Sequence, residues 1–135
     1  MLRILEELKT NLDQGQLDEA YKMLDLLDVE DDKLKEEVLL LLDDHVDADD
    51  LMYAFIHIAE TLDDKTYVRN LFKCIEAIFE KAPNWCGFLL VRIVNNPETF
   101  SVLKALLKQH PDMIPVLNKV REVALEMKTD IPQLG

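Results

Sequence analysis

The chain has 135 residues, of which 49% are hydrophobic and 31% charged, and its formal net charge is −12. This length and composition fit one globular domain, not a disordered or fibrous chain. Nucleic-acid binding is disfavoured, because phosphates are neutralised by clusters of Lys and Arg that the chain lacks. Charges interrupt the N-terminal segment and no apolar run approaches the length of a membrane span, so we expect a cytoplasmic protein without membrane contact.

The negative charge is concentrated in the first half of the chain. Residues 1–64 hold 20 Asp or Glu and 5 Lys or Arg, whereas residues 65–135 hold 7 and 10. The two halves therefore carry −15 and +3. A negative field of this kind attracts positively charged surfaces over long range, which predicts a basic partner.

The first half of the chain predicts helices, because apolar residues recur at three- and four-residue steps. The first two helices are expected at about 2–13 and 17–28. Gly15 separates them, since glycine readily adopts the left-handed conformation that ends a helix. A third helix at about 32–43 follows Asp31, a plausible N-cap.

The second half predicts five more helices. The fourth, at about 48–62, begins with acidic residues, which suit the positive end of the helix dipole, and the fifth covers about 64–81. Three later helices each begin at a proline, whose missing N–H costs nothing in the first turn. These prolines are Pro83, Pro97 and Pro111.

The pattern predicts an all-α fold of about eight antiparallel helices. The helix at 48–62 and the helix after Pro83 are apolar on nearly every face, so both should lie at the centre with neighbours on two sides. Short connections between helices favour a HEAT-like stack of α-hairpins over an irregular helical bundle. We expect residues 1–135 to form a single helical domain that is a monomer before it forms a complex.

No constellation of residues supports catalysis, so we expect neither an enzyme nor a cofactor. The chain has one serine, Ser101, and three glycines, too few for a serine nucleophile motif or a phosphate-binding loop. Only His57 and Glu60 share a helix face, which falls short of the ligand set of a di-metal bundle. We interpret His57 as a packed core histidine and predict no metal site.

Neither the cysteines nor the longest acidic run has the pattern of a metal site. Cys74 and Cys86 lie in apolar helical patterns without the close spacing of zinc or redox motifs, so we interpret both as small buried hydrophobes. The run at 43–50 lacks the central glycine and closing glutamate of an EF-hand. It is therefore either a solvated connection or a protein-binding patch.

A second acidic run, at 28–32, precedes the third helix, whereas the run at 43–50 follows it. In a hairpin stack these two connections would lie at opposite ends of the helices, with acidic side chains of the third helix between them. We name this set the acidic flank and predict that it binds the partner. It consists of Glu30, Asp31, Asp32, Glu36, Glu37, Asp43, Asp44, Asp47, Asp49 and Asp50.

Arg92 lies within an apolar segment, where an unpaired cation costs several kcal/mol of desolvation. It therefore needs a partner within the fold. Glu60 and Glu76 are the nearest candidates by pattern, since each lies on a helix expected to neighbour that of Arg92.

Three blocks of sequence resemble a known bacterial family. They are Phe55–Glu60 (FIHIAE), Lys81–Trp85 (KAPNW) and Val91–Asn96 (VRIVNN), and the resemblance extends over about residues 51–110. The family is that of the polymorphic-toxin immunity proteins numbered thirty, which are similar to the immunity proteins of contact-dependent growth inhibition.

The resemblance implies a cytoplasmic protein that binds and neutralises the C-terminal domain of a cognate toxin. Many such toxins are nucleases with basic grooves, which an acidic inhibitor could block by steric and electrostatic means. The matching positions His57, Glu60, Trp85 and Arg92 are interpreted as a structural motif and not as contacts. The acidic residues 1–43 lie outside the resemblance.

The alternative function is that of a helical-repeat adaptor, which would hold a peptide or a partner protein in the groove of the stack. Residues 12–20 resemble the turn of a tetratricopeptide unit, although the pattern does not recur one period later. The immunity protein is therefore the leading hypothesis.

Overall fold

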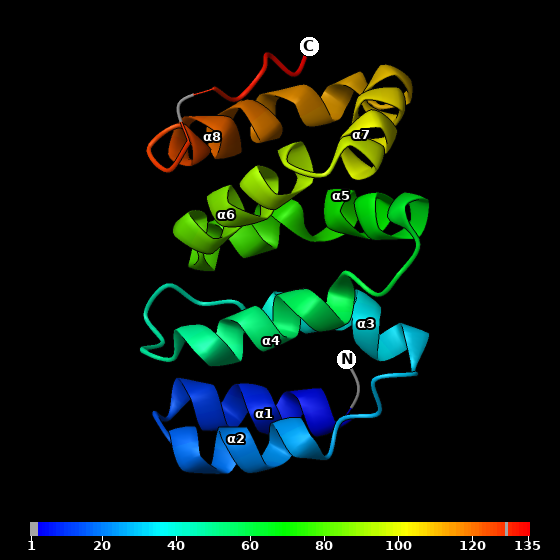
Figure 1. The fold of residues 1–135 in the computed structure, drawn as a ribbon. Helices are drawn as coiled ribbons and strands as arrows, with labels where there is room; N and C mark the ends of the chain where they lie inside the picture. The colour runs from blue at the N-terminus through cyan, green and yellow to red at the C-terminus, as the bar shows by residue number, and fades with distance from the viewer. Residues whose placement is uncertain (1–2, 129) are drawn as a thin grey trace.

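The all-α prediction is confirmed by the computed structural model of the protein, which describes residues 3–128 and 130–135 (Figure 1). This part of the chain contains eight α-helices, two short 3₁₀ segments and no strand. The predicted first helix included Leu2, which lies outside the described residues. The elements are α1 (Arg3–Asp13), α2 (Leu17–Asp25), α3 (Asp32–Glu37), η1 (Val38–Leu41), α4 (Asp49–Ala59), α5 (Asp64–Lys81), α6 (Pro83–Val94), α7 (Pro97–Gln109), η2 (Pro111–Met113) and α8 (Ile114–Ala124).

The helices are stacked in pairs along the long axis of the molecule, with α1 and α2 at one end and α7 and α8 at the other (Figure 1). Alternate helices lie side by side when each 3₁₀ segment is counted together with the α-helix that it adjoins. One layer runs from α1 through η1 and α5 to α7, and in the other α6 packs against α8. Two layers leave the outer side of each central helix facing solvent.

The helix boundaries follow from local chemistry. Gly15 has φ +71° and ends α1 in the predicted left-handed conformation. The Asp31 carboxylate accepts hydrogen bonds from the backbone N–H groups of Lys33 and Leu34, which confirms Asp31 as the N-cap of α3. Pro83 and Pro97 lie in the first turns of α6 and α7, as predicted.

Two predicted helices differ from the structure in their pitch. The third is α-helical only as far as Glu37 and continues as the 3₁₀ segment η1. At this change of pitch the Glu36 carbonyl accepts a hydrogen bond of 2.7 Å from the buried side chain of Asn70. Likewise, Pro111 opens only the 3₁₀ turn η2, and the α-helical part of the last helix begins at Ile114.

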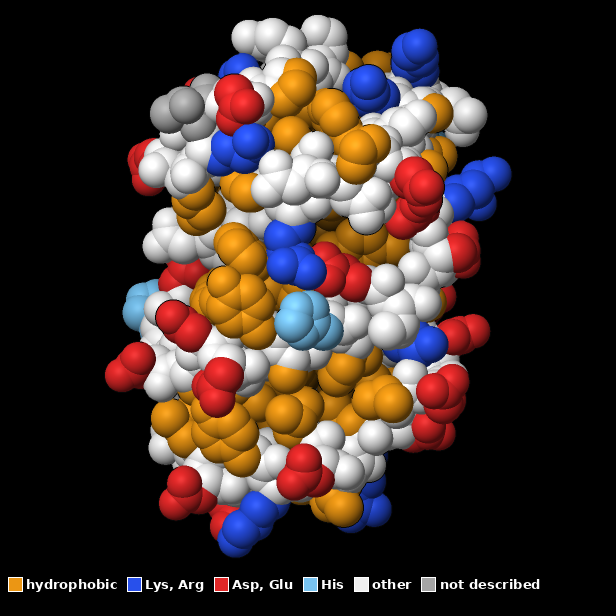
Figure 2. Space-filling view, in the orientation of Figure 1, with side chains coloured by type: hydrophobic (Ala, Val, Ile, Leu, Met, Phe, Trp, Pro, Cys, Tyr) orange, Lys and Arg blue, Asp and Glu red, His pale blue; other side chains and the backbone are white. Residues whose placement is uncertain are grey.

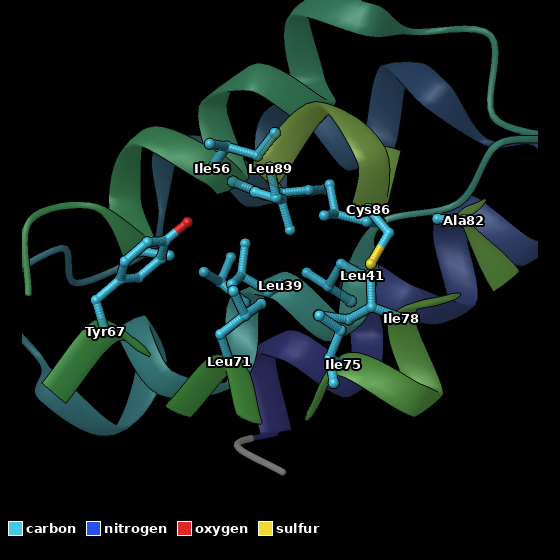
Figure 3. Close-up of a cluster of buried hydrophobic side chains, with 14 of the residues drawn as sticks. Leu39, Leu41, Ile56, Tyr67, Leu71, Ile75, Ile78, Ala82, Cys86 and Leu89 are labelled. Carbon is cyan, nitrogen blue, oxygen red and sulfur yellow. The ribbon is translucent and has the colours of Figure 1, made fainter. Parts of the chain in front are cut away.

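A continuous apolar core lies between the two layers. Leucines and isoleucines from η1, α4, α5 and α6 converge there, among them Leu39, Ile56, Ile75 and Leu89 (Figure 3). Tyr67 belongs to the same cluster and is 3% exposed. The core thus joins the acidic first half of the chain to the near-neutral second half.

Candidate partner-binding surface

The helices α4 and α6, predicted to lie at the centre with neighbours on two sides, do pack against several other elements, but each also leaves one side at the surface. Tyr53 and His57 of α4 are exposed, and Trp85, Phe88 and Arg92 of α6 are only partly buried. The reason is architectural, because in a two-layer stack the outer side of a central helix has no further layer to pack against. Hydrophobic side chains accordingly gather at the surface over these helices (Figure 2).

Three aromatic side chains interlock on this outer face. The ring centroid of Tyr53 lies 5.2 Å from that of Phe88 and 5.6 Å from that of Trp85, and the centroids of Trp85 and Phe88 are 5.7 Å apart. All three contacts are edge-to-face, the arrangement that the aromatic quadrupole favours. We refer to Tyr53, Trp85 and Phe88 as the aromatic cluster.

His57 extends the aromatic cluster along α4. Its ring centroid lies 6.2 Å from that of Tyr53. The interpretation of His57 as a packed core histidine is wrong, since the side chain is exposed. The sequence pattern could not reveal this, because His57 lies among apolar neighbours whether its face of the helix is inner or outer.

Arg92 forms the ion pair that its apolar surroundings predict. Its Nε donates to Glu60 Oε2 and its Nη2 to Glu60 Oε1, each over 2.7 Å, and its guanidinium carbon lies 5.8 Å from the ring centroid of Phe88. The hydrogen bonds to Glu60 raise the pKa of Arg92 above its usual value. Of the two candidate partners, Glu60 is therefore correct and Glu76 is not.

The structure brings together the positions that were interpreted as a structural motif. His57 and Glu60 come from α4, Trp85 and Arg92 come from α6, and all four lie on or next to the outer face of these helices. The Glu60–Arg92 pair does link α4 to α6, as a structural role requires. His57 is exposed, and the other three side chains are partly exposed.

The two acidic runs lie at opposite ends of the helices, as predicted. The connection from α2 to α3 and the connection from η1 to α4 emerge on opposite sides of the stack (Figure 1). The acidic flank is therefore divided between two separate loops, with the third helix between them.

Several residues of the acidic flank form bonds within the fold. The Asp44 carboxylate accepts hydrogen bonds from the backbone N–H groups of Asn84 and Trp85, at 2.8 and 3.2 Å, and so caps the start of α6. The Asp43 carboxylate accepts a hydrogen bond from the His45 backbone. The Asp50 carboxylate accepts one of 2.6 Å from the Tyr21 hydroxyl, and this bond raises the pKa of Tyr21.

On the third helix the acidic charge is partly matched by lysines. Lys33 Nζ lies 3.4 Å from Glu37 Oε1, and Lys35 Nζ lies 3.7 Å from Asp32 Oδ1. Glu36 is partly buried. The net negative charge that the third helix presents to solvent is therefore smaller than its acidic residues alone suggest.

Exposed carboxylates of the acidic flank lie in the two loops and in the first turns of the helices that follow them. Asp47 is exposed in the connection that leads to α4, Asp49 is exposed in the first turn of α4, and Glu30 is exposed in the other loop. The hydrogen bonds from Asn84 and Trp85 to Asp44 fix the loop between η1 and α4 beside α6 and the aromatic cluster. The sequence indicated this loop but not its aromatic neighbours, because an apolar helix pattern does not show which side of the helix faces solvent.

No group of three or more His, Cys, Asp or Glu in residues 3–128 and 130–135 could hold a metal ion. No helix in this part of the chain combines the length and the apolar character needed to cross a bilayer.

Comparison with known proteins places the chain in a family. No curated protein and no solved structure matches it. The family model described as Immunity protein 30 matches residues 3–103. The match thus includes α1 to α3, which lie outside the resemblance at residues 51–110. Because it covers most of the sequence, the chain belongs to the Immunity protein 30 family.

Proposed function

We propose that this protein binds a cognate toxin domain in the cytoplasm and neutralises it. The observation that carries the proposal is the match of residues 3–103 to Immunity protein 30, since an immunity protein protects a cell by neutralising a toxin. In this proposal the chain acts as a monomeric binding protein and performs no catalysis.

The charge of the chain favours a toxin with a basic surface, such as a nuclease. A nuclease attracts the phosphates of its substrate with Lys and Arg, and an inhibitor with a net charge of −12 can use the same attraction. Complementary charge of this kind accelerates association and disfavours wrong partners. The inhibitor would then block the toxin by occupying its basic groove.

The outer face of α4 and α6 offers the surface for this contact. Protein interfaces are enriched in aromatic residues and arginine at their centre and are more polar at the rim. The aromatic cluster and Arg92 provide such a centre, and the exposed Asp47 and Asp49 provide an acidic rim at the start of α4. This part of the acidic flank is therefore better placed for binding than the third helix.

Growth of bacteria that express the toxin domain encoded beside the gene for this protein tests the proposal. Co-expression of the chain should restore growth, and the two purified proteins should elute together from a size-exclusion column. A toxin domain of unrelated sequence serves as the control and should remain lethal. Unrestored growth together with separate elution of the folded proteins would contradict the proposal.

A further inference from the structure

A pocket of about 350 Å³ opens where four helix ends meet. Its lining comes from the end of α4, the start of α5, the end of α6 and the start of α7. The lining residues with charged groups or hydroxyl groups are Glu60, Asp64, Tyr67, Arg92 and Thr99.

The hydroxyl of Tyr67 is the first observation that points to a ligand. It is buried and has no hydrogen-bond partner within residues 3–128 and 130–135. Burial raises the pKa of Tyr67 far above its usual value, so the group stays protonated at physiological pH. A buried hydroxyl normally has a partner, and Tyr67 is one of the residues that line the pocket.

The charge of the pocket is the second observation. Arg92 is matched by its two hydrogen bonds to Glu60, so this pair contributes no net charge. Asp64 Oδ1 accepts a hydrogen bond of 2.8 Å from the Thr99 hydroxyl, but Asp64 forms no ion pair with any described Lys or Arg. One carboxylate of the pocket therefore lacks a counter-charge.

The position of the pocket relates it to the surface already described. α4 begins beside Asp47 and ends beside the pocket at Glu60, and its 11 residues span about 16 Å at the rise of an α-helix. An interface of ordinary size, about 800 Å² per partner, easily extends over this distance. A protein bound over the aromatic cluster would thus reach the acidic loop at one end of α4 and the pocket at the other.

We infer that the pocket receives the side chain of a lysine or arginine of the bound toxin. The cationic group donates hydrogen bonds to the carboxylate of Asp64 and to the hydroxyl oxygen of Tyr67. It supplies both the counter-charge that Asp64 lacks and the partner that Tyr67 lacks, and the partly enclosed position strengthens the contact. The inference rests on the proposed function, because the toxin is the source of the cation.

Substitution of Asp64 tests the charge of the pocket. Asn at position 64 can still accept the hydrogen bond from Thr99 but carries no charge, so D64N should weaken toxin binding about tenfold or more, measured by calorimetry. The matched control is D63N, because Asp63 is exposed, adjacent in sequence and outside the pocket, and Asn also serves as an N-cap. Equal affinities of D64N and D63N would overturn the inference.

Substitution of Tyr67 separates a binding role from a structural one. Y67F keeps the ring in the core and removes only the unpartnered hydroxyl, so the melting temperature should not fall. Affinity for the toxin should nevertheless fall severalfold. The assignment would be contradicted if Y67F binds the toxin as tightly as the natural chain. It would also be contradicted if the loss of affinity is explained by a smaller fraction of folded protein.

A double-mutant cycle identifies the cation. Each Lys and Arg of the toxin domain is replaced by Ala and measured against both the natural chain and D64N. At one toxin position, the Ala substitution and D64N together should weaken binding much less than the sum of their separate effects. The reason is that D64N has already removed the charge that this toxin cation contacts. If all positions are additive, no toxin cation enters the pocket.

The natural chain measured beside these variants separates the two hypotheses. If the natural chain does not bind the toxin at all, the proposed function fails. If the natural chain binds and inhibits but the pocket variants bind equally well, only the pocket assignment fails.

Discussion

At the scale of single residues, one acidic sequence run contains side chains with different roles. Asp44 caps α6 from a loop about forty residues earlier in the chain, whereas Asp47 lies exposed in the same loop. The sequence showed that this segment was acidic, but it could not separate the two roles, because the cap depends on a tertiary contact. The Glu60–Arg92 pair could be predicted, since a cation in an apolar segment requires a partner nearby.

Replacement of Asp44 by Ala should destabilise the fold. The loss of the cap on α6 is expected to lower the free energy of unfolding by about 1 kcal/mol, measured by urea denaturation. Asp47→Ala in the same loop is the control and should change stability by less than about 0.5 kcal/mol. Equal stability of the two variants would show that Asp44 does not act as a cap.

The two cysteines should differ in their reaction with thiol reagents. Cys86 is 1% exposed and burial raises its pKa to about 12, so at pH 8 it is protonated and covered. Cys74 is only partly buried, contrary to the interpretation of both cysteines as buried. A thiol-labelling time course should show one faster thiol, lost in Cys74→Ala, and a second that reacts only after unfolding. Equal rates in the folded protein would contradict this description.

At the scale of elements, helix boundaries were predictable and exposure was not. The turn at Gly15 and the starts at Pro83 and Pro97 follow from backbone chemistry that acts within a few residues. By contrast, Tyr53 and Trp85 lie in patterns that are equally compatible with a covered helix. Their place at the surface depends on the number of layers in the fold, which no local pattern encodes.

The contact between α6 and α8 should be sensitive to a single methyl group. A Cβ atom at Gly87 would lie 2.9 Å from Cγ1 of Val123 and 3.1 Å from the backbone N of Ala124. Gly87→Ala should therefore lower the free energy of unfolding by about 1 kcal/mol, even though Ala favours helix formation. Ser101→Ala, at an exposed helical position, is the control and should lose no stability. A stabilised Gly87→Ala would mean that the two helices are not so closely packed.

At the scale of the whole molecule, the negative charge is concentrated in one half of the chain. The first 64 residues carry −15 and the remainder +3, so a partner with a basic surface would be attracted mainly to the acidic half. The family match includes this half together with the aromatic cluster. In the proposed function, charge would attract the partner and the apolar face of α4 and α6 would hold it.

The charge of the loop before α4 should affect the rate of association. D47N/D49N should slow association with the toxin about twofold to fivefold at low salt, measured by stopped flow. The difference should vanish near 1 M salt, where the screening length is about 3 Å. The control is E122Q/E126Q, which removes the same charge from exposed positions near the C-terminus and should have a much smaller effect. Equal rates of the two double variants would exclude electrostatic steering by this loop.

Hydroxyl-radical footprinting of the chain with and without its toxin tests the binding surface most directly. Oxidation of Tyr53 and Trp85 should fall several-fold in the complex, because both lie at the centre of the outer face of α4 and α6. Met127, which is 46% exposed beyond α8, should react equally in both samples. Unchanged oxidation of Tyr53 and Trp85 in a stable complex would show that the toxin binds elsewhere.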